Sequence, residues 1–163
     1  MKETIISLFN FQLLYLRKII RNIPEDRLYE RQLDYFNSAG WLLGHICVEA
    51  EDVFNHLNIS YDKLDLNWYA WFKNSTGAIE SLDDLPTKQQ LLVKLEERYT
   101  LLSSLYLNLS DKQRLTDHPS KMLKEVFPNL DSWFAHHLTT HIAIHCGNIV
   151  VWKKMIGLDA DGF

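Results

Sequence analysis

Two histidines have the spacing that suits a shared metal ion. His141 and His145 lie four residues apart in the largely apolar segment AHHLTTHIAIHCGN. Side chains four apart are neighbours on a helix, so both imidazoles can reach one ion at about 2.0–2.1 Å. His137 lies one turn earlier on the same face, whereas we expect His136 to point elsewhere. The spacing therefore predicts a divalent-metal site on a helix.

A second stripe of polar residues lies earlier in the chain. His45, Glu49, Asp52 and His56 follow one another at intervals of four, three and four, which places them on one helix face. A lone histidine on an apolar helix is more often a satisfied core residue than a ligand, and charged stripes usually face water. The residues alone leave open whether this stripe meets the first.

The elements that must position these side chains are four long helices, found from apolar periodicity and capping residues. The first helix is expected from about Lys2 to Arg21 or Asn22, and the second from a cap at Asn37 or Ser38 to Leu57 or Asn58. The third is expected from a capping box at Thr87 and Gln90 to about Asn108. The last is expected from a cap at Asn129 or Asp131 to Met155, with Gly157 just beyond it. Without strand-like alternation, this pattern predicts an all-α fold, a four-helix bundle.

Residues 58 to 86, between the second and third helices, lose the helical period and are rich in turn residues and aromatic rings. A connection of this length is often functional. The rings in it are Tyr61, Trp68, Tyr69, Trp71 and Phe72.

Composition narrows the class of protein. The 163 residues predict a single domain over 1–163. The 17 basic and 21 acidic residues give a net charge of −4 without clusters of Lys and Arg, which argues against nucleic acid as a partner. The N-terminal segment is too polar to span a membrane. Cys47 and Cys146 lie in apolar helical patterns, so we expect packing residues and a cytoplasmic setting.

The segments NSAGWLLGHICVEAED and HHLTTHIAIHCGNIV resemble the two signature helices of DinB-like metal-binding four-helix bundles. The resemblance implies that His45 joins His141 and His145 as the third ligand of a divalent ion, namely zinc, nickel or iron(II). Cys146 and Asn148 stand where the family commonly has arginine and glutamine, which weakens inferences about the substrate more than inferences about the metal.

The resemblance also implies a metal-dependent enzyme that activates water or a low-molecular-weight thiol, in the hydrolase or thiol S-transferase class, with a small-molecule substrate. Glu49 is then expected to orient a histidine ligand or to be a fourth ligand. His137 lies outside the ligand set and lines the pocket, where it or Asp52 relays a proton. The aromatic connection is expected to form a substrate wall with Trp68, Tyr69, Trp71 and Phe72. His56 and His118 are expected to be ordinary polar residues.

The sequence leaves two other hypotheses open for the kind of protein. One is a binding module in which the ion only locks two helices together, and the other is a helical bundle without metal. A homodimer is also expected, because apolar side chains lie at outer helix positions. These positions are Leu13, Tyr15, Val150 and Val151.

Overall fold

The computed structural model describes residues 2–33, 35–73 and 84–159. Its four long helical rods are α1 (Lys2–Arg21), α2 (Ala39–His56), α4 (Lys88–Asn108) and a continuous run of α6 (Leu130–Ala135), η3 (His136–His141) and α7 (Ile142–Met155). No strand occurs among the described residues, where a single isolated bridge joins Asp117 to Asn129. The predicted all-α fold with four long helices is confirmed.

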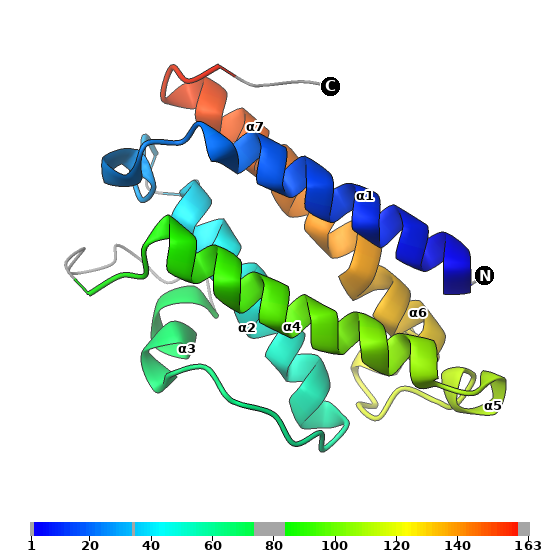
Figure 1. Ribbon diagram of the computed structural model, residues 1–163. Helices are drawn as coiled ribbons and strands as arrows, with labels where there is room; N and C mark the ends of the chain where they lie inside the picture. The colour runs from blue at the N-terminus through cyan, green and yellow to red at the C-terminus, as the bar shows by residue number, and fades with distance from the viewer. Residues whose placement is uncertain (1, 34, 74–83, 160–163) are drawn as a thin grey trace.

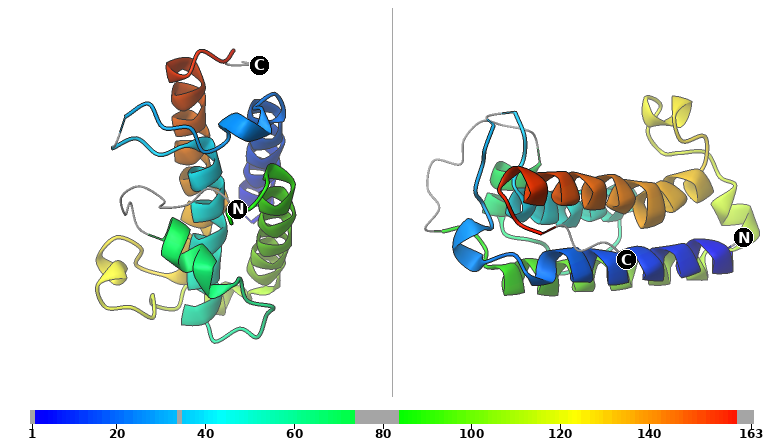
Figure 2. Two further views of the ribbon diagram at one scale, coloured as in Figure 1. Left: turned by 90° about the vertical axis from the view of Figure 1, so that its left-hand side faces the viewer. Right: turned by 90° about the horizontal axis from the view of Figure 1, so that it is seen from above.

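The rods form two pairs, as Figures 1 and 2 show. α1 lies beside α7 and runs in the same direction, whereas α2 and α4 lie together and run the opposite way. Because α2 and α4 are parallel, the chain between them must travel back along the bundle, about 27 Å for an 18-residue helix. This return explains why the longest connection in the chain falls between these two helices.

Capping residues fix where the long helices begin and end. The Ser38 hydroxyl accepts a hydrogen bond from the Trp41 amide at 3.3 Å, so Ser38 rather than Asn37 is the cap of α2. Thr87 forms the predicted capping box with Gln90, and Asn129 caps α6. Gly157 follows α7 with φ +72, a left-handed conformation that glycine adopts without steric penalty.

The sequence predicted an irregular connection between α2 and α4, but part of this connection is helical. Leu66–Phe72 forms a short helix, α3, which Asp65 caps by accepting a hydrogen bond from the Asn67 amide at 2.8 Å. Seven residues are too few to show a helical period, and four of them are aromatic. Residues 74–83 of the predicted aromatic segment lie outside the described part of the chain.

A buried carboxylate holds α3 and the segment before it against the bundle. Glu51 is fully buried on α2 and pairs with Arg98 of α4 at 2.7 Å. Its oxygens also accept hydrogen bonds from the Leu64 amide at 2.9 Å and from the Tyr69 and Tyr61 hydroxyls. This network ties the connection to both helices that it joins, and the sequence analysis did not single it out.

The remaining elements are short: η1 (Glu25–Arg27), α5 (Asp111–Arg114) and η2 (Leu123–Glu125). Both cysteines are buried free thiols, in line with the packing role expected of them. Of the four outer positions expected at a dimer face, Val151 is exposed and the other three are partly buried. Among the described helices, none combines the length and apolarity that crossing a bilayer requires.

Candidate metal centre

Three histidines from two rods meet inside the bundle. Nitrogen atoms of His45 on α2, His141 at the end of η3 and His145 on α7 all lie within 4.8 Å of one another. The Nε2 atoms of His141 and His145 are 3.1 Å apart. In the described part of the chain, no other group of three histidine, cysteine or acidic side chains comes this close. The structure thus brings together the three residues that the family resemblance had grouped.

The spacing of these nitrogens fits a divalent ion. Two nitrogens bound at about 2.0–2.1 Å in tetrahedral geometry lie about 3.3–3.4 Å apart. The separation of 3.1 Å between the Nε2 atoms of His141 and His145 is close to this value. The His45 nitrogen lies within 4.8 Å of the other two, so a small inward movement of His45 brings it to the same ion. Three neutral imidazoles are also a donor set that zinc, nickel and iron(II) accept.

His45 is held in the orientation that a ligand needs. Its Nδ1 donates to the carbonyl oxygen of Phe72 at 2.8 Å, which leaves Nε2 with a free lone pair. Trp41 stacks on the imidazole with ring centroids 4.8 Å apart and an interplanar angle of 14°. A carbonyl at the end of α3 therefore does what the sequence analysis expected of Glu49, because it fixes the tautomer of a histidine in the candidate ligand set.

Gly44 lets α3 approach α2 closely enough for this hydrogen bond. A Cβ at position 44 would stand 2.5 Å from the Phe72 ring, so the ring and its helix would have to move. We expect Gly44→Ala to lower the free energy of unfolding by about 1–3 kcal/mol through overpacking. It should also weaken metal binding about 10–100-fold, as loss of an outer hydrogen bond to a ligand does.

Denaturant unfolding and metal titration of this variant check both effects. Gly147→Ala is the matched control, because a Cβ there would meet nothing within 4 Å. If Gly44→Ala binds metal as tightly as the parent protein, the Phe72 carbonyl does not position His45.

Burial keeps the imidazoles neutral. Burial, helped by the neighbouring histidines, lowers the pKa of His141 to about 2 and that of His145 to about 4. Burial also lowers the pKa of His45, against the opposing effect of its hydrogen bond to Phe72. Neutral imidazole is the form that binds metals, so the site needs little proton release before it can accept an ion.

The last rod changes its helical period at the site. η3 (His136–His141) is a π-helical segment, in which residues five apart become neighbours. The expectation that His136 points elsewhere is therefore wrong, because its ring lies 5.6 Å from His141 and 5.3 Å from His137 between centroids. Such π segments inside α-helices often coincide with functional sites.

A cavity of about 140 Å³ adjoins the three histidines on the side of His141. Its lining residues lie on α2, in and just after η2, and on the last rod. They include Glu49, Asp52 and His56 of the polar stripe on α2. The residues that line it are Glu49, Asp52, His56, Leu123, Phe127, Trp133, His136, His137 and His141. Both predicted catalytic residues, Glu49 and His137, thus lie beside the histidine cluster.

Glu49 has an unusual environment for a carboxylate. Burial and the neighbouring charge of Asp52 raise its pKa to about 7, against the opposing effect of Lys73. Asp52 itself is paired with Lys73 at 2.8 Å. A carboxyl group that gains and loses its proton near neutral pH suits general acid–base chemistry.

His137, which lines the cavity, and His118, which lies behind it against Trp133, are both buried. His137 is 6% exposed, its Nδ1 has no hydrogen-bond partner among the described residues, and burial lowers its pKa to about 3. His118 is 4% exposed and lies 4.2 Å from Trp133 between ring centroids. The Nδ1 of His118 accepts a hydrogen bond from the Ser120 amide at 3.0 Å, so this histidine helps to shape the loop behind the cavity.

The rings expected to form a substrate wall do not line the cavity beside His141. Among the described residues that line the cavity at His141, none comes from α3. Phe72 instead packs against Gly44, and Tyr69 bonds to Glu51. The indoles of Trp68 and Trp71 line a different cavity, between α3 and α4. α3 therefore lies outside this cavity and contacts the histidine cluster through the hydrogen bond between His45 and the Phe72 carbonyl.

The fold and the site together define a helical bundle with three histidines converging from its second and last long helices. The sequence pattern of the DinB superfamily matches residues 10–149, and the chain belongs to this superfamily. The match includes all three converging histidines.

Two solved structures share this fold. A crystal structure of a protein from Streptococcus pneumoniae aligns with 95% of this chain and 91% of its own, with a TM-score of 0.66 and 16% sequence identity. An uncharacterized protein from Clostridium difficile 630 aligns with 95% of this chain and 96% of its own, with a TM-score of 0.65 and 19% identity. No curated protein matches the chain. At these identities the likeness shows the fold alone.

Proposed function

We propose that this protein binds one divalent metal ion through His45, His141 and His145, and that it is a metal-dependent enzyme acting on a small molecule with water or a low-molecular-weight thiol as nucleophile. The observation that carries the proposal is the convergence of three neutral imidazoles within 4.8 Å. Three protein ligands leave positions open for an exchangeable ligand, the usual arrangement at catalytic zinc.

When bound, the ion supplies a Lewis acid that lowers the pKa of water or a thiol, so that a nucleophile exists near neutral pH. The chain supplies the rest of the chemistry. The cavity of about 140 Å³ next to His141 takes a molecule of only a few heavy atoms, or the reacting end of a larger one. The rings of Trp133 and Phe127 in its wall limit the water around the reacting group.

Glu49 is the general acid–base group in this proposal. Its carboxyl lines the same cavity as His141, and its pKa of about 7 places both protonation states within reach. His137 lines the cavity as a neutral imidazole, which can accept or donate a hydrogen bond to the substrate. Asp52 and its partner Lys73 tune the charge near Glu49.

The test is a panel of small thiols and water with activated electrophiles, assayed with metal-loaded and chelated protein. Turnover should require the ion, and Glu49→Gln should reduce it about 10²–10⁴-fold while the bound metal is retained. Glu96→Gln, an exposed position on α4, is the matched control and should leave turnover unchanged.

Each outcome bears on a different part of the proposal. Turnover that survives complete removal of metal rules out the metal-dependent mechanism. Metal binding without turnover on any nucleophile of the panel favours the alternative of a binding module, in which the ion only links α2 to the last rod.

A further inference from the structure

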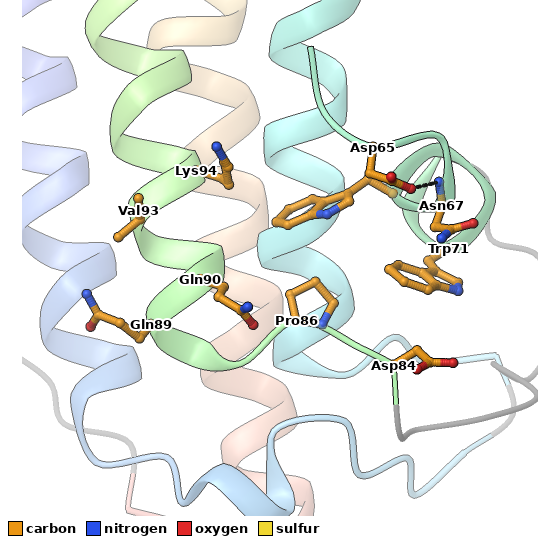
Figure 3. A pocket seen from close by; sticks show the side chains of 10 residues that line it. Asp65, Asn67, Trp71, Asp84, Pro86, Gln89, Gln90, Val93 and Lys94 are labelled. Atoms are coloured by element: carbon orange, nitrogen blue, oxygen red, sulfur yellow. Dashed lines mark hydrogen bonds between the residues drawn. The ribbon is translucent and has the colours of Figure 1, made fainter. Parts of the chain in front are cut away.

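A second cavity, of about 370 Å³, lies between α3 and the beginning of α4. Its described walls contain no histidine, so it is separate from the candidate metal centre. Figure 3 shows Asp65, Asn67 and Trp71 on the α3 side of the cavity and Gln90 and Val93 on α4, with the Asp65 carboxylate turned toward the Asn67 amide. The full set of described residues around it is Asp65, Asn67, Trp68, Trp71, Asp84, Pro86, Gln89, Gln90, Val93 and Lys94.

Two indoles dominate the apolar part of this cavity. Trp68 and Trp71 are three residues apart on α3, so they share one side of that helix. Both rings pack on Phe72, with centroids 5.6 Å and 6.0 Å away. The Trp71 carbonyl also accepts a hydrogen bond from the Trp41 indole at 2.9 Å. The aromatic wall is therefore held in place from behind, before any ligand arrives.

The charged groups around the cavity are unbalanced in sign. Asp65 and Asp84 contribute two carboxylates. Lys94 is the one cation among the described lining residues, and it is already paired with Glu97 at 2.9 Å. The Asp65 carboxylate is fixed in direction because it caps α3 through the Asn67 amide. The described lining residues thus carry more negative than positive charge.

We propose that this cavity binds a small organic cation, with an ammonium group against the indoles of Trp68 and Trp71 and its charge balanced by Asp65 and Asp84. Indole faces attract cations through the ring quadrupole, and aromatic walls are a recurrent means of recognising quaternary ammonium groups. An anionic ligand would meet two carboxylates and no unpaired cation among the described lining residues. A cavity of about 370 Å³ falls within the usual range for small-molecule sites.

The test follows the five indole N–H signals by NMR during titration with choline at constant ionic strength. The signals of Trp68 and Trp71, assigned from Trp68→Phe and Trp71→Phe, should shift in a saturable way. Trp133 and Trp152 should not, because neither lines the cavity. The neutral isostere 3,3-dimethylbutan-1-ol should bind at least about threefold more weakly than choline, because it lacks the positive charge that the indoles and carboxylates attract.

A charge-removing variant tests the carboxylates. In Asp65→Asn with Asp84→Asn, the amide at position 65 still caps α3, so the fold is retained while both charges are lost. Its affinity for choline should fall roughly fivefold or more, since two charges close to the cation are removed. Gln89→Glu, which adds a carboxylate to the wall, should tighten binding.

Three results would overturn the proposal. They are the absence of saturable shifts, equal binding of the neutral alcohol, and shifts of equal size at Trp133 and Trp152. Because the titration needs no metal, its outcome is independent of the function proposed for the histidines.

Discussion

Glu51→Ala is expected to lower the free energy of unfolding by about 3 kcal/mol, because it removes the buried counter-charge of Arg98 and leaves only the partly exposed Glu97, at 3.0 Å, to pair with the guanidinium. The side chains of the pair are 0% and 5% exposed, so water cannot replace the lost carboxylate. The Leu64 amide and the Tyr69 hydroxyl lose their acceptor as well. This is a large share of the roughly 5–15 kcal/mol that stabilises a typical domain.

Denaturant unfolding measures the effect, with Glu96→Ala as the matched control. Glu96 pairs with Arg17 at 3.0 Å, but both side chains are more than half exposed, and a surface pair of this kind contributes about 0–1 kcal/mol. Glu51→Gln keeps the shape of the side chain and gives a folded variant if the alanine variant does not fold. Unfolding of both Glu51 variants within about 1 kcal/mol of the parent protein would contradict the role given to the network.

The long helices could be predicted from the sequence because each one carries its own signals. Apolar periodicity and the caps at Ser38, Thr87 and Asn129 act over a few residues, and the structure confirms all three. α3 has a cap at Asp65 but is too short to show a period, and its seven residues are held by long-range bonds to Glu51 and α2. The π-helical segment at His136–His141 depends on packing within the bundle, which a single sequence does not display.

In the candidate site, too, some features could be predicted from the sequence and others could not. The spacing of His141 and His145 was readable from the sequence, whereas their meeting with His45 followed only from the family resemblance. The hydrogen bond from His45 to the Phe72 carbonyl was not predictable, because a backbone acceptor leaves no residue type to recognise. Glu51 was missed for a different reason: it lies off the stripe of Glu49 and Asp52 and reads as an ordinary helix-surface acid.

His141→Ala and His145→Ala are each expected to weaken metal binding at least about 100-fold, beyond the 10–100-fold typical of losing an outer hydrogen bond. Either variant leaves two imidazoles, and two ligands hold an ion poorly. The ion should stabilise the parent protein by about 2.7 kcal/mol at a free concentration 100 times its dissociation constant. At the same ion concentration that gain should fall to about 0.4 kcal/mol or less in both variants.

His56→Ala is the matched control for these variants. His56 lies on α2 and lines the cavity, yet it is not one of the three converging histidines. Its metal affinity should equal that of the parent protein. Equal losses in His56→Ala and His145→Ala would mean that the bound ion sits elsewhere.

Metal content of the purified protein, measured by elemental analysis after incubation with a divalent ion and exhaustive dialysis, tests the central claim most directly. The arrangement of His45, His141 and His145 predicts one ion per chain in the parent protein and in His56→Ala, and none in His141→Ala or His145→Ala. A parent protein that retains no divalent ion, or variants that retain as much as the parent, would contradict it.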